Sequence, residues 1–453
     1  MRDLVVFGLF VFLLPLCLMR PWVGICTFTF LAYNRTQDLT WGFARSLPIS
    51  QFVALAMIIG WMVFEFRPLP IRFHRIKAMM LLVVVVGLSI AFNRVRWGAQ
   101  GDRYIELVKV VFVSVMTAAM LINRFRLRTI MAVMACGLGF YGFKNGVMYA
   151  LGSKSIAGPG GMLKDNNDFA LAMVMNLPLL VYLAKEMQPL KHGKWICRFM
   201  QTAACMSLLT IMSTGSRGAF LSLGVASGLM AWKTKYKFPA LGGLVLVAVL
   251  GVTFAPAEYK DRIMSMFVSA DEQDESVQGR FTSWLVATNM IKANPGFGIG
   301  FNNMVYEYNN YTQGIYNEQG TTEHFARVAH NSYFQIWAES GTIAYLLFMF
   351  MIVGTIVTLE QQRRRYKREG DLWVIPYCNA IQVAMCSFMI GATFLNRAHF
   401  DFIYQLVVVA TVLPVIVDAE RVANKKTARR TGPRPAQDVW VRPRDPFVRA
   451  GTN

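Results

Sequence analysis

The sequence predicts an all-α fold: a polytopic membrane protein of about twelve transmembrane helices with one large loop on the periplasmic side. The 453 residues are 55% hydrophobic, and the apolar residues recur in blocks close to the roughly 20 residues that a helix needs to span a bilayer. Loops rich in lysine and arginine alternate with loops that are poorer in them, as expected when successive helices cross in opposite directions. Helices are expected because a spanning segment must satisfy its own backbone polar groups.

The apolar segments fill most of the first 254 residues and of residues 332–417. They lie at 4–33, 50–66, 77–93, 104–122, 128–151, 167–184, 196–213, 217–232, 237–254, 332–359, 371–393 and 398–417. The first contains Pro15, Arg20 and Pro21, so it forms either one kinked span, which puts both chain ends inside, or a tight hairpin, which puts the start outside. No convincing cleavage site follows, and we expect a retained span.

Loop charge orients the helices. The basic loops are expected to face the cytoplasm, and they contain Arg67, Arg72, Arg75, Lys77, Arg124, Arg126, Arg128, Lys185, Lys191, Lys194, Arg198, Lys233, Lys235, Lys237, Arg363, Arg364, Arg365, Lys367 and Arg368. These loops and the basic tail account for much of the formal charge of +20. The charge therefore indicates membrane lipids as partners and no nucleic acid.

Four parts follow from this pattern. Residues 1–254 form an N-terminal transmembrane bundle, 255–331 a large periplasmic loop with short helices, 332–417 C-terminal transmembrane helices, and 418–453 a disordered basic cytoplasmic tail. The seven cysteines lie in or beside apolar segments, which predicts neither a disulfide framework nor a zinc site.

Several arginines of the outer side depart from the charge rule. One outer loop holds Arg94, Arg96 and Arg103, and a second group consists of Arg217, Arg280, Arg327 and Arg397. Ordinary variation in short loops would explain the first group. Arginines gathered around an anionic ligand would explain both, because a guanidinium binds phosphate oxygens in a bidentate manner.

Arg217 lies in the segment 213–218, which joins two apolar segments with almost no loop. A helix starting there would present N–H groups to an anion beside the guanidinium. An interfacial arginine that snorkels to water would show the same pattern.

Arg280 follows Gly279 and precedes an amphipathic run through Trp284 to Ile291. We expect this run to lie on the outer membrane surface with Arg280 at its N-terminal end. The helix dipole disfavours a cation there, which favours a functional role over a simple exposed arginine.

The glycine-rich segment 294–300 predicts a tight turn that closes this helix, and it could shape an oligosaccharide-binding surface. It is not a P-loop, because no Gly-Lys-Ser/Thr follows. His330 stands where the loop meets the next apolar segment, ahead of Tyr333, Phe334, Trp337 and Gly341. Its imidazole could accept a proton from a sugar hydroxyl or simply anchor the helix.

Three further acidic or imidazole positions are candidates. The acidic run 271–275 does not have the spacing of a calcium loop, and a solvated surface run is the stronger interpretation. Asp165 and Asp168 stand at another outer helix start, where capping explains them and glycan contact is an alternative. His399, near Arg397 and Asp401, could line the same ligand-binding cavity as these acidic residues. No metal site and no cofactor are predicted.

Together these residues resemble the O-antigen ligase/polymerase family of bacterial envelope proteins. The resemblance rests on short motifs in order: Ser216-Arg217-Gly218, Arg280 followed by Trp284, Asn294-Pro295 with Gly298-Ile299-Gly300, and His330-Asn331-Ser332 followed by Glu339-Ser340-Gly341. The opening residues also resemble the exosortase-associated O-glycosylation ligase subgroup. The match covers most of the chain and is strongest from Arg217 to Gly341.

The resemblance implies a membrane glycosyltransferase of the bacterial inner membrane with a GT-C-like fold and an active site facing the periplasm. It implies glycan transfer from undecaprenyl pyrophosphate to an acceptor hydroxyl such as that of lipid A-core, without a metal. Arg217 and Arg280 would hold the pyrophosphate and His330 would act at the acceptor hydroxyl. To these the residues themselves add Arg327, Asp168 and His399 as substrate-binding candidates. Direct displacement predicts inversion at the anomeric carbon.

Other functions fit the same sequence. A repeat-unit polymerase or a protein O-oligosaccharyltransferase would need the same donor site with a different acceptor. A lipid or polysaccharide transporter would instead show internal repeats and polar residues near the midplane, and no clear repeat is visible.

Overall fold

The computed structural model describes residues 2–36, 42–45, 47–93, 97–153, 158–161, 163–254, 275–315, 321–322 and 324–431. Its longer α-helices are α1 (Arg2–Met19), α2 (Pro21–Asn34), α3 (Ile49–Val63), α4 (His74–Phe92), α5 (Trp97–Met120), α6 (Arg124–Ala150), α7 (Asn166–Leu183), α8 (Gly193–Thr214), α9 (Arg217–Trp232), α10 (Lys237–Phe254), α12 (Glu275–Ala293), α14 (Ser332–Glu369), α15 (Ile375–Gly391) and α16 (Asp401–Thr431). The short elements are η2 (Phe43–Arg45), η3 (Lys185–Met187), α13 (Met304–Glu307), η5 (Tyr308–Tyr311) and η6 (Leu372–Val374). No strand occurs among these residues.

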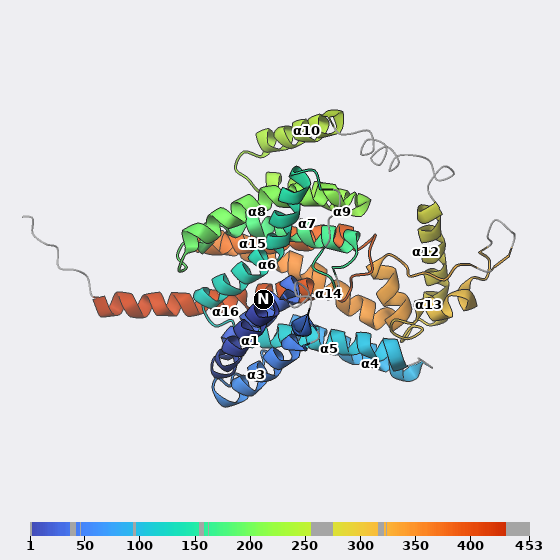
Figure 1. Cartoon of the computed structure of the whole chain (residues 1–453), viewed down its shortest axis with the longest axis horizontal. Helices are drawn as coiled ribbons and strands as arrows, with labels where there is room; N and C mark the ends of the chain where they lie inside the picture. Colours follow the sequence, from blue (N-terminus) through green and yellow to red (C-terminus); the bar gives the residue numbers. More distant parts are fainter. Residues whose placement is uncertain are drawn as a thin grey trace, which may run out of the picture.

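The protein is an all-α polytopic membrane protein. In the described part of the chain, 7 helices are long and apolar enough to cross a bilayer: α1, α4, α6, α8, α14, the segment Leu372–Gly391 and the first part of α16. The helices of the bundle run along the longest axis of the molecule, with α12 and α13 at one end and the last turns of α16 at the other (Figure 1). We call these the outer end and the inner end. The total of twelve spans stays a prediction.

Residues 4–33 form two helices, which supports the hairpin interpretation over a single kinked span. The backbone leaves the helical region at Arg20, immediately before Pro21. The Asp3 carboxylate accepts hydrogen bonds from the backbone N–H groups of Gly42 at 3.0 Å and Ala44 at 3.2 Å. Because these residues follow α2, the start of α1 lies at the same end of the bundle as the end of α2.

The centre of the bundle is built on α7 and α15. Every residue of α7 from Asp168 to Leu180 is buried, and most of α15 is buried as well. These two helices pack on each other, and α7 also packs on α6, α8 and α9. A helix that is apolar on all sides is expected where neighbours surround it completely, so α7 and α15 provide the rigid base for the loops at their outer ends.

The tail differs from the prediction. We expected disorder from residue 418, but α16 continues to Thr431. Arg421 explains part of this extension, because its guanidinium pairs with Asp371 (Nε to Oδ2, 2.8 Å) and with Glu369 at 2.5 Å. These ion pairs tie α16 to the inner end of α14 and to η6. Residues 432–453 lie outside the described residues.

A second, smaller core lies at the outer end, where α12, α13, η5 and the beginning of α14 meet (Figure 1). It is made of Val286, Ala287, Met290, Ile299, Met304, Tyr308, Ala329 and Ala338. On the opposite side of α12, Phe281 and Leu285 are 51% and 55% exposed. This exposed apolar side agrees with the expected amphipathic helix. The expected start of that helix was wrong, because α12 begins at Glu275 and Arg280 therefore lies in its second turn.

The glycine-rich turn after α12 is docked onto a break in α14. Gly341 has φ 82° inside the helix, and a Cβ there would lie 1.9 Å from the Gly296 carbonyl oxygen. The turn and the break exchange backbone hydrogen bonds: Ile299 N to Ala338 O at 2.9 Å, Gly300 N to Glu339 O at 3.0 Å and Thr342 N to Pro295 O at 3.0 Å. The turn is thus a structural joint that fixes α12 against the membrane bundle.

Candidate functional site

Arg217 is the first residue of α9, as predicted. α8 ends at Thr214, Gly215 closes it with φ 61°, and the Ser216 hydroxyl caps α9 by accepting from Ala219 N. Only two residues separate the helices, and α9 packs on α7 and α15, so the position of Arg217 is fixed by a short turn and a packed helix rather than by a loop. A Cβ on Gly218 would lie 3.0 Å from Cβ of Phe394, which places the start of α9 against the loop between α15 and α16.

Arg327 packs against α12 at the residue that precedes Arg280. A Cβ on Gly279 would lie 1.9 Å from Nη1 of Arg327, so the guanidinium of Arg327 rests on the backbone of α12 one residue before Arg280. Gly279 therefore serves to admit Arg327 rather than to start the helix.

His330 has a strained backbone that is held on both sides. Its φ is 47°, a region in which non-glycine residues are uncommon and which often marks functional positions. On one side the Trp284 indole N–H donates to Ala329 O at 2.9 Å. On the other side Asn331 N donates to Oδ1 of Asn396 at 3.0 Å. The backbone on both sides of His330 is thus held by contacts with α12 and with the loop before α16.

The charges of neighbouring residues shift the pKa values of Arg280 and His330. Burial and the charge of Arg217 lower the pKa of Arg280, while Asp165 opposes them. Burial lowers the pKa of His330, and Arg280 and Arg327 lower it further against the opposing effect of Asp165. The imidazole is therefore neutral near pH 7 and can accept a proton. Arg217, Arg280, Arg327 and His330, with Asp165, form what we call the arginine–histidine cluster.

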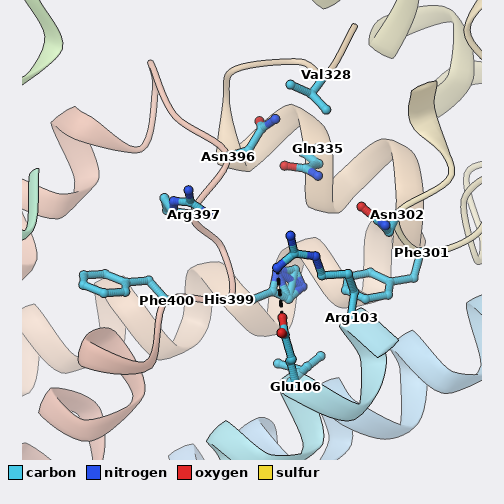
Figure 2. A pocket seen from close by; sticks show the side chains of 11 residues that line it. Arg103, Glu106, Phe301, Asn302, Val328, Gln335, Asn396, Arg397, His399 and Phe400 are labelled. Atoms are coloured by element: carbon cyan, nitrogen blue, oxygen red, sulfur yellow. Dashed lines mark hydrogen bonds and ion pairs between the residues drawn. The ribbon is translucent and has the colours of Figure 1, made fainter. Parts of the chain in front are cut away.

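A polar cavity of about 180 Å³ lies close along the chain to His330, since Val328 is among its lining residues. Figure 2 shows the side chains that line it. Polar side chains from four segments line it: Arg103 and Glu106 of α5, Asn302 after the glycine-rich turn, Gln335 of α14, and Asn396, Arg397 and His399 of the loop before α16. Val328 also lines it, two residues before His330, and Asn396 bonds the residue after His330. The cavity and the cluster therefore share the segment 327–331 as a wall.

His399 lines this cavity; its expected role in binding substrate stays a prediction. Burial, followed by the charges of Arg397 and Arg103, lowers its pKa to about 4, so it is neutral. Its ring packs on Phe301 with centroids 4.8 Å apart, and its Nε2 is buried without a hydrogen-bond partner among the described residues. An unpaired imidazole nitrogen is costly when buried, which suggests a partner that the cavity would supply. Arg103 pairs with Glu106, one turn further along α5, at 2.9 Å on one wall of the same cavity (Figure 2).

Asp168 does not belong to the arginine–histidine cluster. Its carboxylate is buried and pairs with Arg397, so it holds the beginning of α7 to the loop before α16. The acidic residue that influences Arg280 and His330 is instead Asp165, the N-cap of α7, whose carboxylate accepts from Asn167 N at 2.8 Å. The sequence pointed to both residues, and Asp168 was the one predicted to contact substrate.

Sequence reasoning missed Gln335, Asn302 and Asn396. Their amides carry no motif, and only the folding of distant segments onto one cavity brings them together. Arg94, Arg96 and residues 271–274 of the acidic run lie outside the described residues. Within the described ranges no group of three or more His, Cys, Asp or Glu residues could hold a metal ion.

Comparisons with known proteins agree with the resemblance. Residues 202–349 match the family model described as O-antigen ligase. Residues 1–187 match the model of a family of unknown function (DUF5935). A search of curated proteins finds no match. The O-antigen ligase match contains all three arginines of the cluster and His330, whereas Asp165, Arg397 and His399 lie outside it.

Proposed function

We propose that this chain, a member of the O-antigen ligase family by residues 202–349, transfers a glycan from undecaprenyl pyrophosphate to an acceptor hydroxyl. The observation that supports the proposal is a chain of influences between separate segments: the charge of Arg217, the first residue of α9, lowers the pKa of Arg280, and the charge of Arg280 lowers the pKa of His330. The reaction would occur at the periplasmic face of the bacterial inner membrane. The match of residues 202–349 to the O-antigen ligase model supports this class of reaction, and the donor, the acceptor and the mechanism are our inference.

The two arginines suit the leaving group. Transfer breaks the bond between the anomeric carbon and the pyrophosphate oxygen, and the electron pair leaves with that oxygen. Guanidinium groups stabilise this growing negative charge more in the transition state than in the bound donor, which is the condition for catalysis. Arg217 stands at a helix N-terminus, whose N–H groups favour an anion as well. Arg327, packed on Gly279, would add a third positive charge.

His330 suits the acceptor. The acceptor oxygen forms a bond to the anomeric carbon as the pyrophosphate leaves, and its proton must go to a base. A neutral imidazole can accept it, and the lowered pKa of His330 keeps the ring neutral. The pyrophosphate needs no general acid because it is already a good leaving group. A single displacement of this kind inverts the anomeric carbon, and neither a metal nor a nucleotide enters the scheme.

The neighbouring polar cavity would bind sugar. Amides such as those of Gln335, Asn302 and Asn396 donate and accept hydrogen bonds, as sugar hydroxyls require. The unpaired Nε2 of His399 offers a further partner. Asp168 would act as a positioning residue that orients Arg397 at the wall of the cavity.

The test is reconstitution of the full chain in lipid vesicles with a glycan linked to undecaprenyl pyrophosphate. Lipid A-core, a second lipid-linked glycan and a serine-containing peptide are offered in turn, and the products are identified by mass spectrometry. Glycan attached to lipid A-core, with inverted anomeric configuration and released undecaprenyl pyrophosphate, is the expected result. Product only on the second glycan or on the peptide would indicate the polymerase or the protein ligase instead.

A transporter is the alternative from another class. The grouping of the charged candidates at the outer end, rather than along the length of the bundle, favours the enzyme. Movement of intact donor across vesicles without any transferred product would favour the transporter.

A further inference from the structure

A cavity of about 650 Å³ at the inner end, far along the bundle from the arginine–histidine cluster, is surrounded by positive charge. We define the inner basic cavity by its charged residues: Lys233, Lys235, Lys237, Arg363, Lys367 and Glu360. Five cations face one carboxylate, so the net charge of the wall is +4. The cavity lies between two pairs of helices. The end of α9 and the beginning of α10 form one side, and α14 and α15 form the other.

The single carboxylate does not neutralise this wall. Glu360 is shared, since it pairs with Arg363 at 2.7 Å, with Arg364 at 2.8 Å and more distantly with Lys233 at 3.8 Å. Lys235, Lys237 and Lys367 make no ion pair with any residue that the structure describes. Their charges are therefore available to an anionic ligand.

The protein holds part of this wall in place. Lys233 is half-buried, and its Nζ donates to Oε1 of Gln382 at 2.5 Å. The amide nitrogen of Gln382 in turn donates to Ile356 O at 3.1 Å. A lysine whose direction is set by a second helix is not a freely moving surface cation. The cavity thus has a fixed base on α14 and α15 and flexible lysines at its rim.

Aromatic rings place the cavity at the level of the membrane interface. Lys237 Nζ lies 4.7 Å from the ring centre of Trp232, and Lys235 Nζ lies 4.7 Å from that of Tyr236. Both rings are exposed, and tryptophan and tyrosine collect where a membrane meets water. α10 packs chiefly on α9 and stands at the edge of the bundle (Figure 1), which leaves the cavity reachable from the lipid.

We propose that the inner basic cavity binds the phosphate of an anionic phospholipid headgroup from the inner leaflet. Basic pockets between transmembrane helices on the cytoplasmic side are suited to such headgroups. A soluble phosphate ester carries the same group, but the interfacial rings and the open edge at α10 favour a lipid. The site lies outside the proposed glycan transfer and does not depend on it.

The experiment uses the purified full chain, stripped of lipid in detergent. Phosphatidylglycerol, zwitterionic phosphatidylethanolamine, inorganic phosphate and glycerol 3-phosphate are titrated separately, and bound ligand is counted by native mass spectrometry. Saturable binding of phosphatidylglycerol with weaker binding of phosphatidylethanolamine is expected. Equal binding of the two lipids would overturn the proposal, as would binding of the soluble phosphates without phosphatidylglycerol.

The variant Lys235→Gln/Lys367→Gln removes two exposed charges from the rim and leaves the fixed base intact. It should weaken phosphatidylglycerol binding roughly 30-fold, at about a tenfold change per 1.4 kcal/mol and about 1 kcal/mol for each lysine. The matched control is Lys191→Gln/Lys194→Gln, which removes two exposed charges of the inner end away from the cavity. An equal loss in the control would mean that general surface charge attracts the lipid, and an unchanged rim variant would also refute the site.

Discussion

The carboxylate of Asp168, in the first turn of α7, forms an ion pair with the guanidinium of Arg397, in the loop that leads into α16. The two residues are far apart in the chain, and the pair closes the outer end of the bundle beside the polar cavity. Asp168 is 7% exposed and the Arg397 side chain 25% exposed. Losing one partner would leave the other charge buried and unpaired.

Asp168→Asn should therefore lower the free energy of unfolding by about 3 kcal/mol. Arg397→Gln should have a similar effect, and the double variant should be less destabilised than the sum of the two. Thermal unfolding in detergent measures all three variants as a double-mutant cycle. If the two effects simply add, the pair does not contribute as the structure implies. If Asp168 is a positioning residue, Asp168→Glu should restore much of the transfer activity.

His330→Ala should abolish glycan transfer. A positioned base contributes a factor of about 100 to 10,000, and no other imidazole belongs to the arginine–histidine cluster within the described residues. Membrane insertion and the unfolding temperature should stay close to wild type. His324→Ala is the control, because that side chain contacts Ile315 O on the far side of the loop. Full activity of the His330 variant would remove the proposed base.

Arg280→Lys should impair transfer although it keeps the positive charge. A lysine cannot form the bidentate contact of a guanidinium, and a lost charge-assisted hydrogen bond is worth about 1.5–3 kcal/mol, so kcat/KM should fall roughly tenfold or more. Lys292→Gln, an exposed cation of the same helix, should leave the rate unchanged. Wild-type turnover of Arg280→Lys would argue against the pyrophosphate contact.

The acidic side of the pH profile should report His330. Because burial and Arg280 lower its pKa below the ordinary value of 6.5, the ring stays neutral and competent until the pH falls below that value. Activity should then decline as the ring takes up a proton. Arg327→Gln removes one of the charges that lower this pKa, so its decline should begin at a higher pH. An unchanged profile in this variant, measured as kcat/KM, would show that another group sets the limit.

Gly341→Ala should be strongly destabilising. An alanine at φ 82° is strained, and its Cβ would lie 1.9 Å from the Gly296 carbonyl oxygen, so a loss of about 2 kcal/mol or more is expected. Gly228→Ala on α9 is the matched control, because a Cβ there meets nothing within 4 Å. It should be neutral or stabilise the helix by roughly 0.5–1 kcal/mol. Thermal unfolding of the two variants compares them directly.

Much of the fold could be predicted from hydrophobic periodicity, because a membrane-spanning helix needs a long apolar segment and little else. The break at Gly341 could not, since the glycine stands inside such a segment and its φ depends on the approach of Gly296. For a similar reason, the sequence does not decide whether residues 4–33 form a hairpin or a single kinked span. It is fixed by Asp3 accepting from Gly42 and Ala44, contacts that no local pattern reveals.

The part of the candidate site that could be predicted from the sequence consists of arginines on the outer side, where the charge rule disfavours them. Arg217 and Arg280 stood out because cations at the outer side of a membrane protein need a reason. Gln335, Asn302 and Asn396 gave no such signal, because neutral amides are common in every outer loop. The sequence could not show which of Asp165 and Asp168 influences the cluster, because both stand at the same helix start. The structure distinguishes them, because Arg397 pairs with Asp168.

The joint between the glycine-rich turn and α14 also determines how the stretch between Gly300 and His330 is attached to the bundle. The main chain holds both ends of the stretch between Gly300 and His330, through Gly300 N to Glu339 O and through Ala329 O to the Trp284 indole. Between these two anchors, Met304 and Tyr308 fill the small outer core, and Asn302 and Val328 line the polar cavity. Because both anchors are backbone contacts to helices, a change of side chain within the stretch leaves the two attachment points to the transmembrane scaffold in place.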